Sequence, residues 1–149
     1  MKKKGLFLIL VLFLSIFLTG CRTDFDNNNT KLINVSFNKP IGYKDSRYPI
    51  GNLEDGREYE IRVYEFSDYS IEILWRDKDT FKKYTKDSDV KYSKKTINDK
   101  DYKYAESDNS IVYITEHMDG LYVFKFNGNK SEENLDNFND VMKSVKYRK

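Results

Sequence analysis

The chain has 149 residues, which suits a single domain. Its 26 basic and 24 acidic residues nearly cancel, so the composition lacks the strong positive charge of nucleic-acid-binding domains. One cysteine excludes an intramolecular disulfide, and one histidine leaves no second imidazole for a histidine-rich zinc site. We therefore expect a core that packing alone stabilises.

The first twenty residues have the pattern of a secretory signal. Three lysines at positions 2–4 precede an apolar stretch from Leu6 to Leu18 that only Ser15 interrupts. Such signals combine a basic start, an apolar stretch of about 7–15 residues and small residues before the cleavage point, whereas a membrane span needs about 20 apolar residues. We predict that residues 1–20 are removed. The remaining chain then has 23 basic and 24 acidic residues, a net charge of −1.

Leu18-Thr19-Gly20-Cys21 closes this stretch and resembles the lipobox of bacterial lipoproteins. The resemblance implies that the Cys21 thiol takes a diacylglyceryl group and that cleavage after Gly20 leaves Cys21 as the lipidated N-terminus. It implies no cofactor beyond this covalent lipid, which anchors the protein to the outer face of the cell membrane, because two or more acyl chains bind a bilayer stably. The abundance of Lys, Asn, Tyr and Ile indicates an AT-rich and Gram-positive source.

Polar residues dominate the stretch from Arg22 to Thr30, so we predict a lipidated cysteine and flexible tether over 21–30 and one domain over 31–149. Ile33, Val35 and Phe37 then alternate with polar residues, which predicts a strand that Pro40 ends. The next stretch contains three glycines and Pro49. It therefore predicts a long loop from Ile41 to Gly56.

Alternating apolar residues predict several further strands, separated by turns rich in Ser, Asn and Asp. The predicted strands are 59–66, 71–75, 91–97 and 102–105, with turns at 67–68 and 98–99. Between the second and third of these strands, Phe81 and Tyr84 are spaced three apart, which predicts one or two helical turns within Thr80–Lys86.

The clearest predicted hairpin joins 111–117 to 121–127. Asp119-Gly120 is a strong two-residue hairpin turn, and with this pair as the loop Met118 lies opposite Leu121. Glu116 and Lys125 then share the exposed face. The opposite face carries the aromatic residues, which we expect to be buried: Tyr113, Tyr122, Phe124 and Phe126.

A helical period follows Gly128. The apolar residues of one stripe are Leu135, Phe138, Val141, Met142 and Val145. Ser131 is suited to cap the first turn, and Ser144–Tyr147 either continues the helix or forms a short final strand. The predicted fold class is α+β, a twisted antiparallel sheet packed against a C-terminal helix.

Two stretches are similar to exported bacterial domains of the PsbP/Mog1-like family. Val35–Tyr43 is similar to an opening strand followed by Pro-x-Gly-aromatic, and Phe138–Tyr147 to a closing helix followed by Ser-Val-Lys-Tyr. The resemblance implies an α-β-α sandwich around an antiparallel sheet. It implies no chemistry, because members of that family mostly act as accessory or binding proteins and share no catalytic residues.

Residues that carry catalytic or metal chemistry are few. A serine-histidine-aspartate site needs His117, which we place at a hairpin tip and interpret as a packed or surface residue. Closely spaced aspartates lack the glycine and distant glutamate of an EF-hand, so we interpret them as solvated turn residues and predict no metal site. These pairs are Asp77/Asp79, Asp87/Asp89 and Asp99/Asp101.

Twelve tyrosines are the unusual feature of the composition. Most fit half-buried strand positions, but Tyr43, Tyr48 and Tyr59 are candidates for an exposed binding surface, because two of them lie in the long loop. We expect a non-enzymatic binding or accessory module that engages another envelope or extracellular protein. The alternatives are a small-ligand or glycan-binding lipoprotein that uses the loop over the sheet, and an extracytoplasmic hydrolase acting through His117 and acids.

Mass spectrometry of the native protein tests the anchor. We expect a chain that begins at Cys21 and carries acyl chains on it, and we expect Cys21→Ser to remain unlipidated. A native protein with an intact Met1, or with a free Cys21 thiol, would contradict the lipobox assignment.

Overall fold

The computed structural model describes residues 29–32, 34–48, 50–52, 58–77, 90–118 and 120–149. Within these ranges no helix is both long and apolar enough to cross a bilayer. The signal, Cys21 and the predicted helical turns of Thr80–Lys86 lie outside the described residues. β1 begins at Asn29, so its first two residues belong to the stretch predicted as a tether.

Most described strands belong to one antiparallel sheet with the order β3-β5-β6-β10-β9-β8-β7, in which β4 also pairs with β5. Its strands are β3 (Asp45–Arg47), β4 (Ile50–Asn52), β5 (Glu58–Glu65), β6 (Tyr69–Asp77), β7 (Ser93–Ile97), β8 (Lys100–Ser107), β9 (Ser110–His117) and β10 (Gly120–Gly128). A smaller sheet has the order β1-β2-β11, with β1 at Asn29–Leu32, β2 at Val35–Asn38 and β11 at Lys146–Tyr147.

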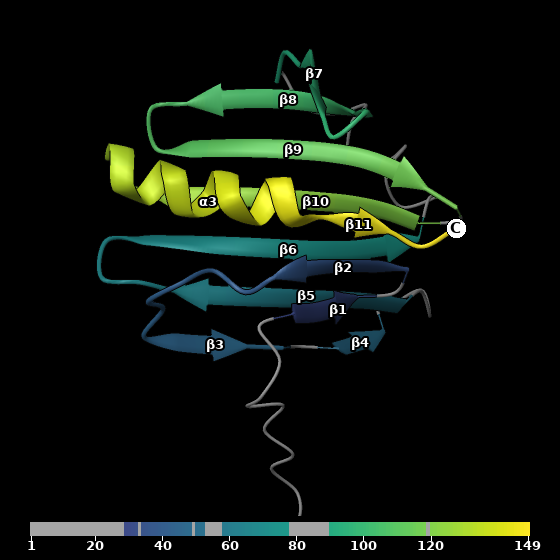
Figure 1. Cartoon of the computed structure of the whole chain (residues 1–149), viewed down its shortest axis with the longest axis horizontal. Coiled ribbons are helices and arrows are strands. Elements are labelled where there is room, and N and C mark those ends of the chain that lie inside the picture. Colours follow the sequence, from purple (N-terminus) through teal and green to yellow (C-terminus); the bar gives the residue numbers. More distant parts are fainter. Residues whose placement is uncertain (1–28, 33, 49, 53–57, 78–89, 119) are drawn as a thin grey trace, which may run out of the picture.

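The described helix, α3 (Glu132–Ser144), and the smaller sheet lie on one face of the large sheet (Figure 1). This architecture confirms the predicted α+β class, with strands in the majority. The core forms between these two layers, because alternate residues of the central strands point toward α3. The residues of the sheet that are under 1% exposed are Tyr64, Ile71, Ile73, Tyr122, Phe124 and Phe126.

α3 presents its predicted apolar stripe to this aromatic face. Phe138, Val141 and Met142 are each 1% exposed, and Val145 is 6% exposed. The Ser131 side chain accepts a hydrogen bond from the Asn134 N–H at 3.3 Å, which confirms the predicted N-cap. The helix ends at Ser144 and β11 follows at once, so the final segment contains both of the alternatives that the sequence left open.

The predicted loop from Ile41 to Gly56 is wrong in part, because it contains β3 and β4. Both strands pair with β5 in one continuous register, from Asp45 opposite Glu65 to Asn52 opposite Glu58. They are therefore two halves of a single edge strand. Pro49 falls between the halves and has no N–H to donate to a ladder, which is typical of edge strands.

The predicted register of the hairpin is also wrong. His117 pairs with Gly120, so the connecting residues are Met118 and Asp119, and Met118 has a positive φ of 53°. The predicted faces survive because the pairing moves by two residues, so that Tyr113 lies opposite Phe124 instead of Phe126, and an even shift keeps each side chain on its face. Tyr113 is 6% exposed. Gly120 is needed in the strand itself, since a Cβ there would overlap the indole ring of Trp75.

The other described strands confirm their predictions. β5, β6, β7 and β8 each overlap the predicted ranges. The turn between β7 and β8 lies at Asn98 and Asp99, whose φ values of 48° and 61° suit a tight hairpin.

Gly120→Ala tests the contact with Trp75. We expect the free energy of unfolding to fall by about 1–3 kcal/mol, because an added methyl group must displace the indole. Thermal denaturation and the emission spectrum of Trp75, the single tryptophan, are the measurements. Gly42→Ala is the comparison variant. With open space around its Cβ position but a φ of +80°, it should lose stability through backbone strain alone and leave the Trp75 emission unchanged. Equal melting temperatures for wild type and Gly120→Ala would contradict this packing.

Candidate binding surface

Tyr64 on β5 brings two of the three candidate tyrosines together. Its ring is fully buried and receives the edge of Tyr43 at a centroid distance of 5.2 Å and that of Tyr48 at 6.3 Å. Edge-to-face pairs of this kind add about 0.5–1.5 kcal/mol beyond the buried area. Tyr43 is half-buried, whereas Tyr48 remains 43% exposed. Tyr64 therefore supports an aromatic surface in which Tyr48 is the accessible member.

The ion pair of Arg62 and Glu60, on the same face of β5 as Tyr64, packs against the Tyr48 ring. The Arg62 guanidinium lies 5.1 Å from the centre of the Tyr48 ring and pairs with the Glu60 carboxylate. Both charged side chains are only 12% exposed. Buried charges require such partners, because desolvation alone is costly. The Tyr48 ring thus contacts the Arg62 guanidinium, which Glu60 keeps in place, as well as the Tyr64 ring.

Tyr59 does not join this surface. It pairs with Arg76 across β5 and β6, and alternation along β5 directs it to the face opposite Tyr64. The structure therefore brings Tyr43 and Tyr48 together and places Tyr59 on the other side of the sheet. None of these positions by itself tests the predicted binding role.

The turn from Pro40 to Tyr43, here called the Ile41 turn, extends the surface toward α3. Pro40 is buried, and Gly42 has a φ of +80°, a value that favours glycine. Ile41 between them is 84% exposed. The Ile41 side chain is thus exposed to solvent, while Pro40 and Gly42 restrict the backbone of the turn.

Asn137 on α3 fixes this turn through both backbone polar groups of Ile41. The Ile41 N–H donates to Asn137 Oδ1 at 3.0 Å, and Asn137 Nδ2 donates to the Ile41 carbonyl at 2.8 Å. Nδ2 also donates to the Tyr69 hydroxyl at 2.8 Å. Two turns further along the same side of α3, Ser144 Oγ accepts from the Asn38 N–H at 2.8 Å. Neither Ile41 nor Asn137 was predicted from the sequence as part of a functional site.

His117 is engaged by the end of the chain. Its Nε2–H donates to the Arg148 carbonyl at 2.6 Å, and its ring lies 5.0 Å from that of Tyr147. The Tyr147 and Tyr102 hydroxyls are 3.0 Å apart, and burial raises the pKa of both. Burial likewise raises the pKa of Tyr122, to about 12. These three tyrosines are therefore neutral at physiological pH, and their rings pack the C-terminal strand against the sheet.

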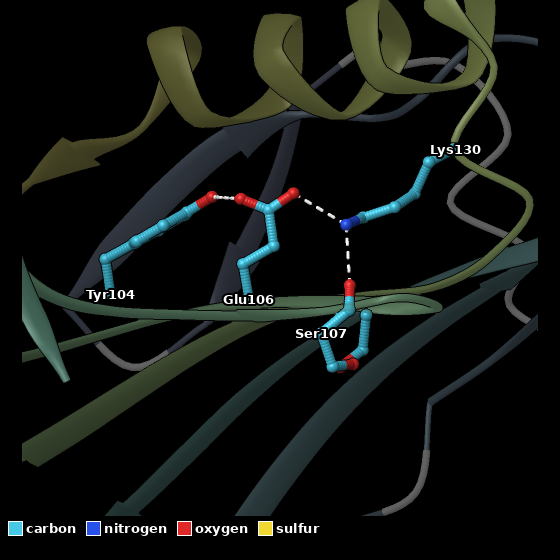
Figure 2. Close-up of polar contacts among 5 residues, drawn as sticks. Tyr104, Glu106, Ser107 and Lys130 are labelled. Atoms are coloured by element: carbon cyan, nitrogen blue, oxygen red, sulfur yellow. Dashed lines mark hydrogen bonds and ion pairs between the residues drawn. The ribbon is translucent and has the colours of Figure 1, made fainter. Parts of the chain in front are cut away.

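A polar network ties β8 to the residue before the cap of α3 (Figure 2). Lys130 Nζ donates to Glu106 at 2.6 Å and to the Ser107 carbonyl at 2.6 Å, while the Tyr104 hydroxyl donates to the same carboxylate. The hydrogen bond from Lys130 lowers the pKa of Glu106, and that from Tyr104 lowers it further. The carboxylate is therefore charged at neutral pH. Any stability it contributes is lost as the pH falls, because the folded-state pKa is the lower one.

The aspartate pairs offer no assembled metal centre in the described ranges, where no three His, Cys, Asp or Glu side chains cluster. Asp101 accepts from Lys94 and Thr96 at 2.7 Å each, and the bond from Lys94 lowers its pKa most. Of the other pairs, Asp79, Asp87 and Asp89 lie outside the described residues.

The opposite face of the sheet carries a pocket of about 520 Å³. Ile114 and Leu121 form its apolar floor and are 6% and 4% exposed. Tyr92 and Lys103 contribute to its walls. This volume is within the range of small-molecule sites.

No known family model matches the chain, and searches of characterised proteins and of solved structures give no match.

Asn137→Ala tests the support of the Ile41 turn. We expect the free energy of unfolding to fall by about 1–3 kcal/mol, because the backbone of Ile41 and the Tyr69 hydroxyl lose their partner. Urea denaturation is the measurement. Asn139→Ala is the matched control on the exposed side of the same helix, where we expect a change within about 0.5 kcal/mol. Equal losses from the two variants would count against the role assigned to Asn137.

Proposed function

We propose that this protein is a lipid-anchored, non-enzymatic binding module of a bacterial cell envelope, tethered through Cys21 on the outer face of the membrane of a Gram-positive cell. The observation that carries the proposal is the surface formed by Ile41 and Tyr48. Both side chains are exposed. Asn137 of α3 bonds the backbone of Ile41, and the Tyr48 ring packs against the buried Tyr64. Binding energy concentrates in apolar and aromatic side chains, and rigid presentation lowers the entropy cost of association.

The contacts of the titratable groups support a non-enzymatic role. His117 commits Nε2 to a backbone carbonyl, and Glu106 and Asp101 are held in ion pairs with lysines. A general base must direct a lone pair toward a substrate proton, whereas each of these groups is oriented by a contact within the fold. The geometry of these groups suits structural contacts better than proton transfer.

The distance from the anchor supports a partner in the envelope. Seven residues lie between Cys21 and Asn29, the first residue of β1, so the two Cα atoms are eight residue steps apart. Fully extended, eight residues span about 30 Å at most. The binding surface of a lipidated protein therefore stays near the bilayer, within reach of membrane or cell-wall proteins.

We further propose that the domain has the α-β-α sandwich of PsbP/Mog1-like proteins. The two stretches that resemble that family contact each other in space. Val35 on β2 pairs with Tyr147 on β11, and Asn137 just before the second stretch bonds the Ile41 turn within the first. Contact between two stretches about a hundred residues apart supports this packing arrangement, because a shared fold requires the opening strand and the closing helix to meet.

The pocket opposite α3 favours a second candidate function, in which the protein carries a small ligand or a glycan. Its apolar floor and the Tyr92 ring suit a flat apolar or sugar face. Titration with short oligosaccharides, monitored by NMR shifts of Ile114 and Leu121, tests this candidate. Shifts that Tyr92→Ala abolishes and Tyr48→Ala leaves intact would favour it over protein binding.

Capture from solubilised envelopes tests the leading proposal. The mature wild-type chain should retain a defined protein in stoichiometric amount. Tyr48→Ala should reduce the retained amount about 10-fold or more, as expected for a hot-spot tyrosine. Tyr43→Ala/Tyr48→Ala should abolish retention.

Met118→Ala is the matched control, because Met118 is 55% exposed on a hairpin tip at a different place in the fold. Melting temperatures of all variants verify folding. Retention that Tyr48→Ala and Met118→Ala reduce equally, or no retention by the wild-type chain, would contradict the proposal.

A further inference from the structure

Ile41 combines high exposure with a fixed backbone. At 84% it is the most exposed large apolar residue among those described; the next three, Met118, Val90 and Tyr48, are 55%, 49% and 43% exposed. Exposed apolar side chains are common singly and need no explanation on their own. The unusual feature is that the backbone of Ile41 is fixed, because Asn137 bonds both its N–H and its carbonyl.

The flanking residues restrict the turn further. Pro40 has a fixed φ and is buried, and the positive φ of Gly42 reverses the chain without a Cβ penalty. Tyr43 then packs on the buried Tyr64. The backbone of Ile41 is thus ordered before any partner arrives, so little conformational entropy remains to be lost on binding.

The charge around the turn is asymmetric. Glu133 and Asp140 lie one helical turn before and after Asn137, on the side of α3 that faces the turn, and both are exposed. The Glu133 charge contributes to the raised pKa of Tyr69, whose hydroxyl Asn137 bonds, although burial is the larger cause. In the sequence around the turn, Lys39 lies two residues before Ile41 and Lys44 lies three residues after it. Asp140 also forms an exposed ion pair with Lys143 at 3.9 Å, a contact that stabilises little in water and leaves the carboxylate accessible. Carboxylates therefore border Ile41 toward α3, and lysines border it along the chain.

We infer that Ile41 is an apolar anchor that inserts into an apolar pocket of an envelope protein, whose rim on the side toward α3 carries Lys or Arg. The inference rests on the proposed binding function and adds the chemistry of its partner. Complementary charges at the rim steer encounter and fix orientation, while the buried apolar side chain provides the affinity.

Site-specific photo-cross-linking in membranes of the source cell tests this inference with the full lipidated chain. A benzophenone amino acid replaces Ile41, Tyr48 or Met118 in three separate proteins. We expect a protein adduct from position 41 at least about fivefold more abundant than from position 118. Peptide mapping should place the adduct beside apolar residues with Lys or Arg next to them.

Charge neutralisation provides the second arm. Glu133→Gln/Asp140→Asn should lower the adduct yield from position 41 about threefold at 50 mM NaCl, and the difference should vanish at 500 mM, because salt screens exposed charges. Glu132→Gln/Asp136→Asn is the matched control. It removes two carboxylates from the same helix, but from positions about 100° and 140° round the helix axis from Asn137, against about 40° and 60° for Glu133 and Asp140, and should lower the yield less.

Three results would overturn the inference: equal yields from positions 41 and 118, an adduct formed with lipid only, or equal effects of the two neutralised pairs. An adduct from Tyr48 without one from Ile41 would refute the Ile41 anchor and leave the proposed binding function standing. The absence of a protein adduct from both positions would contradict both.

Discussion

The packing of α3 against the aromatic face of the large sheet is the constraint on which the rest of the structure depends. The Phe138 ring lies 5.7 Å from Phe126 and 6.0 Å from Tyr113, and it is 1% exposed. Burial of one such ring stabilises the fold by about 1.5–3 kcal/mol. Because successive helical residues are about 100° apart, the rotation that directs Phe138 to the sheet also directs Asn137 to the Ile41 turn.

Three sides of α3 therefore have different structural roles. Its apolar stripe completes the core, its Asn137 and Ser144 side chains bond β2 and the turn that follows it, and its carboxylates face solvent. The proposed binding surface depends on this arrangement, since Ile41 has no fixed position without the helix. A lipid anchor a few nanometres away would then hold a preformed surface near its partners, which suits an accessory module better than a catalyst.

Patterns with a strong period were sufficient to predict the elements that build the core. The aromatic face of the last hairpin follows from two-residue alternation, and α3 follows from its apolar stripe and Ser131. The hairpin register was not predictable in the same way, because Asp119-Gly120 matches a turn motif while Gly120 is in fact required beneath Trp75. That contact joins β10 to its neighbour β6, which is distant in sequence. Likewise, β3 and β4 are too short and polar to show a period, and only their shared register on β5 identifies them. Asn137 lies outside the apolar stripe, so no local pattern indicates that it bonds a residue 96 positions away.

Native-state hydrogen exchange of the Ile41 amide tests most directly the claim that α3 holds this turn in place. The side chain of Ile41 is exposed, so only the bond from its N–H to Asn137 Oδ1 can protect the amide. The account predicts exchange slowed about 100-fold or more relative to an unstructured peptide, because opening requires α3 to move. Exchange at the unprotected rate, while the Phe124 amide in β10 remains protected, would contradict it.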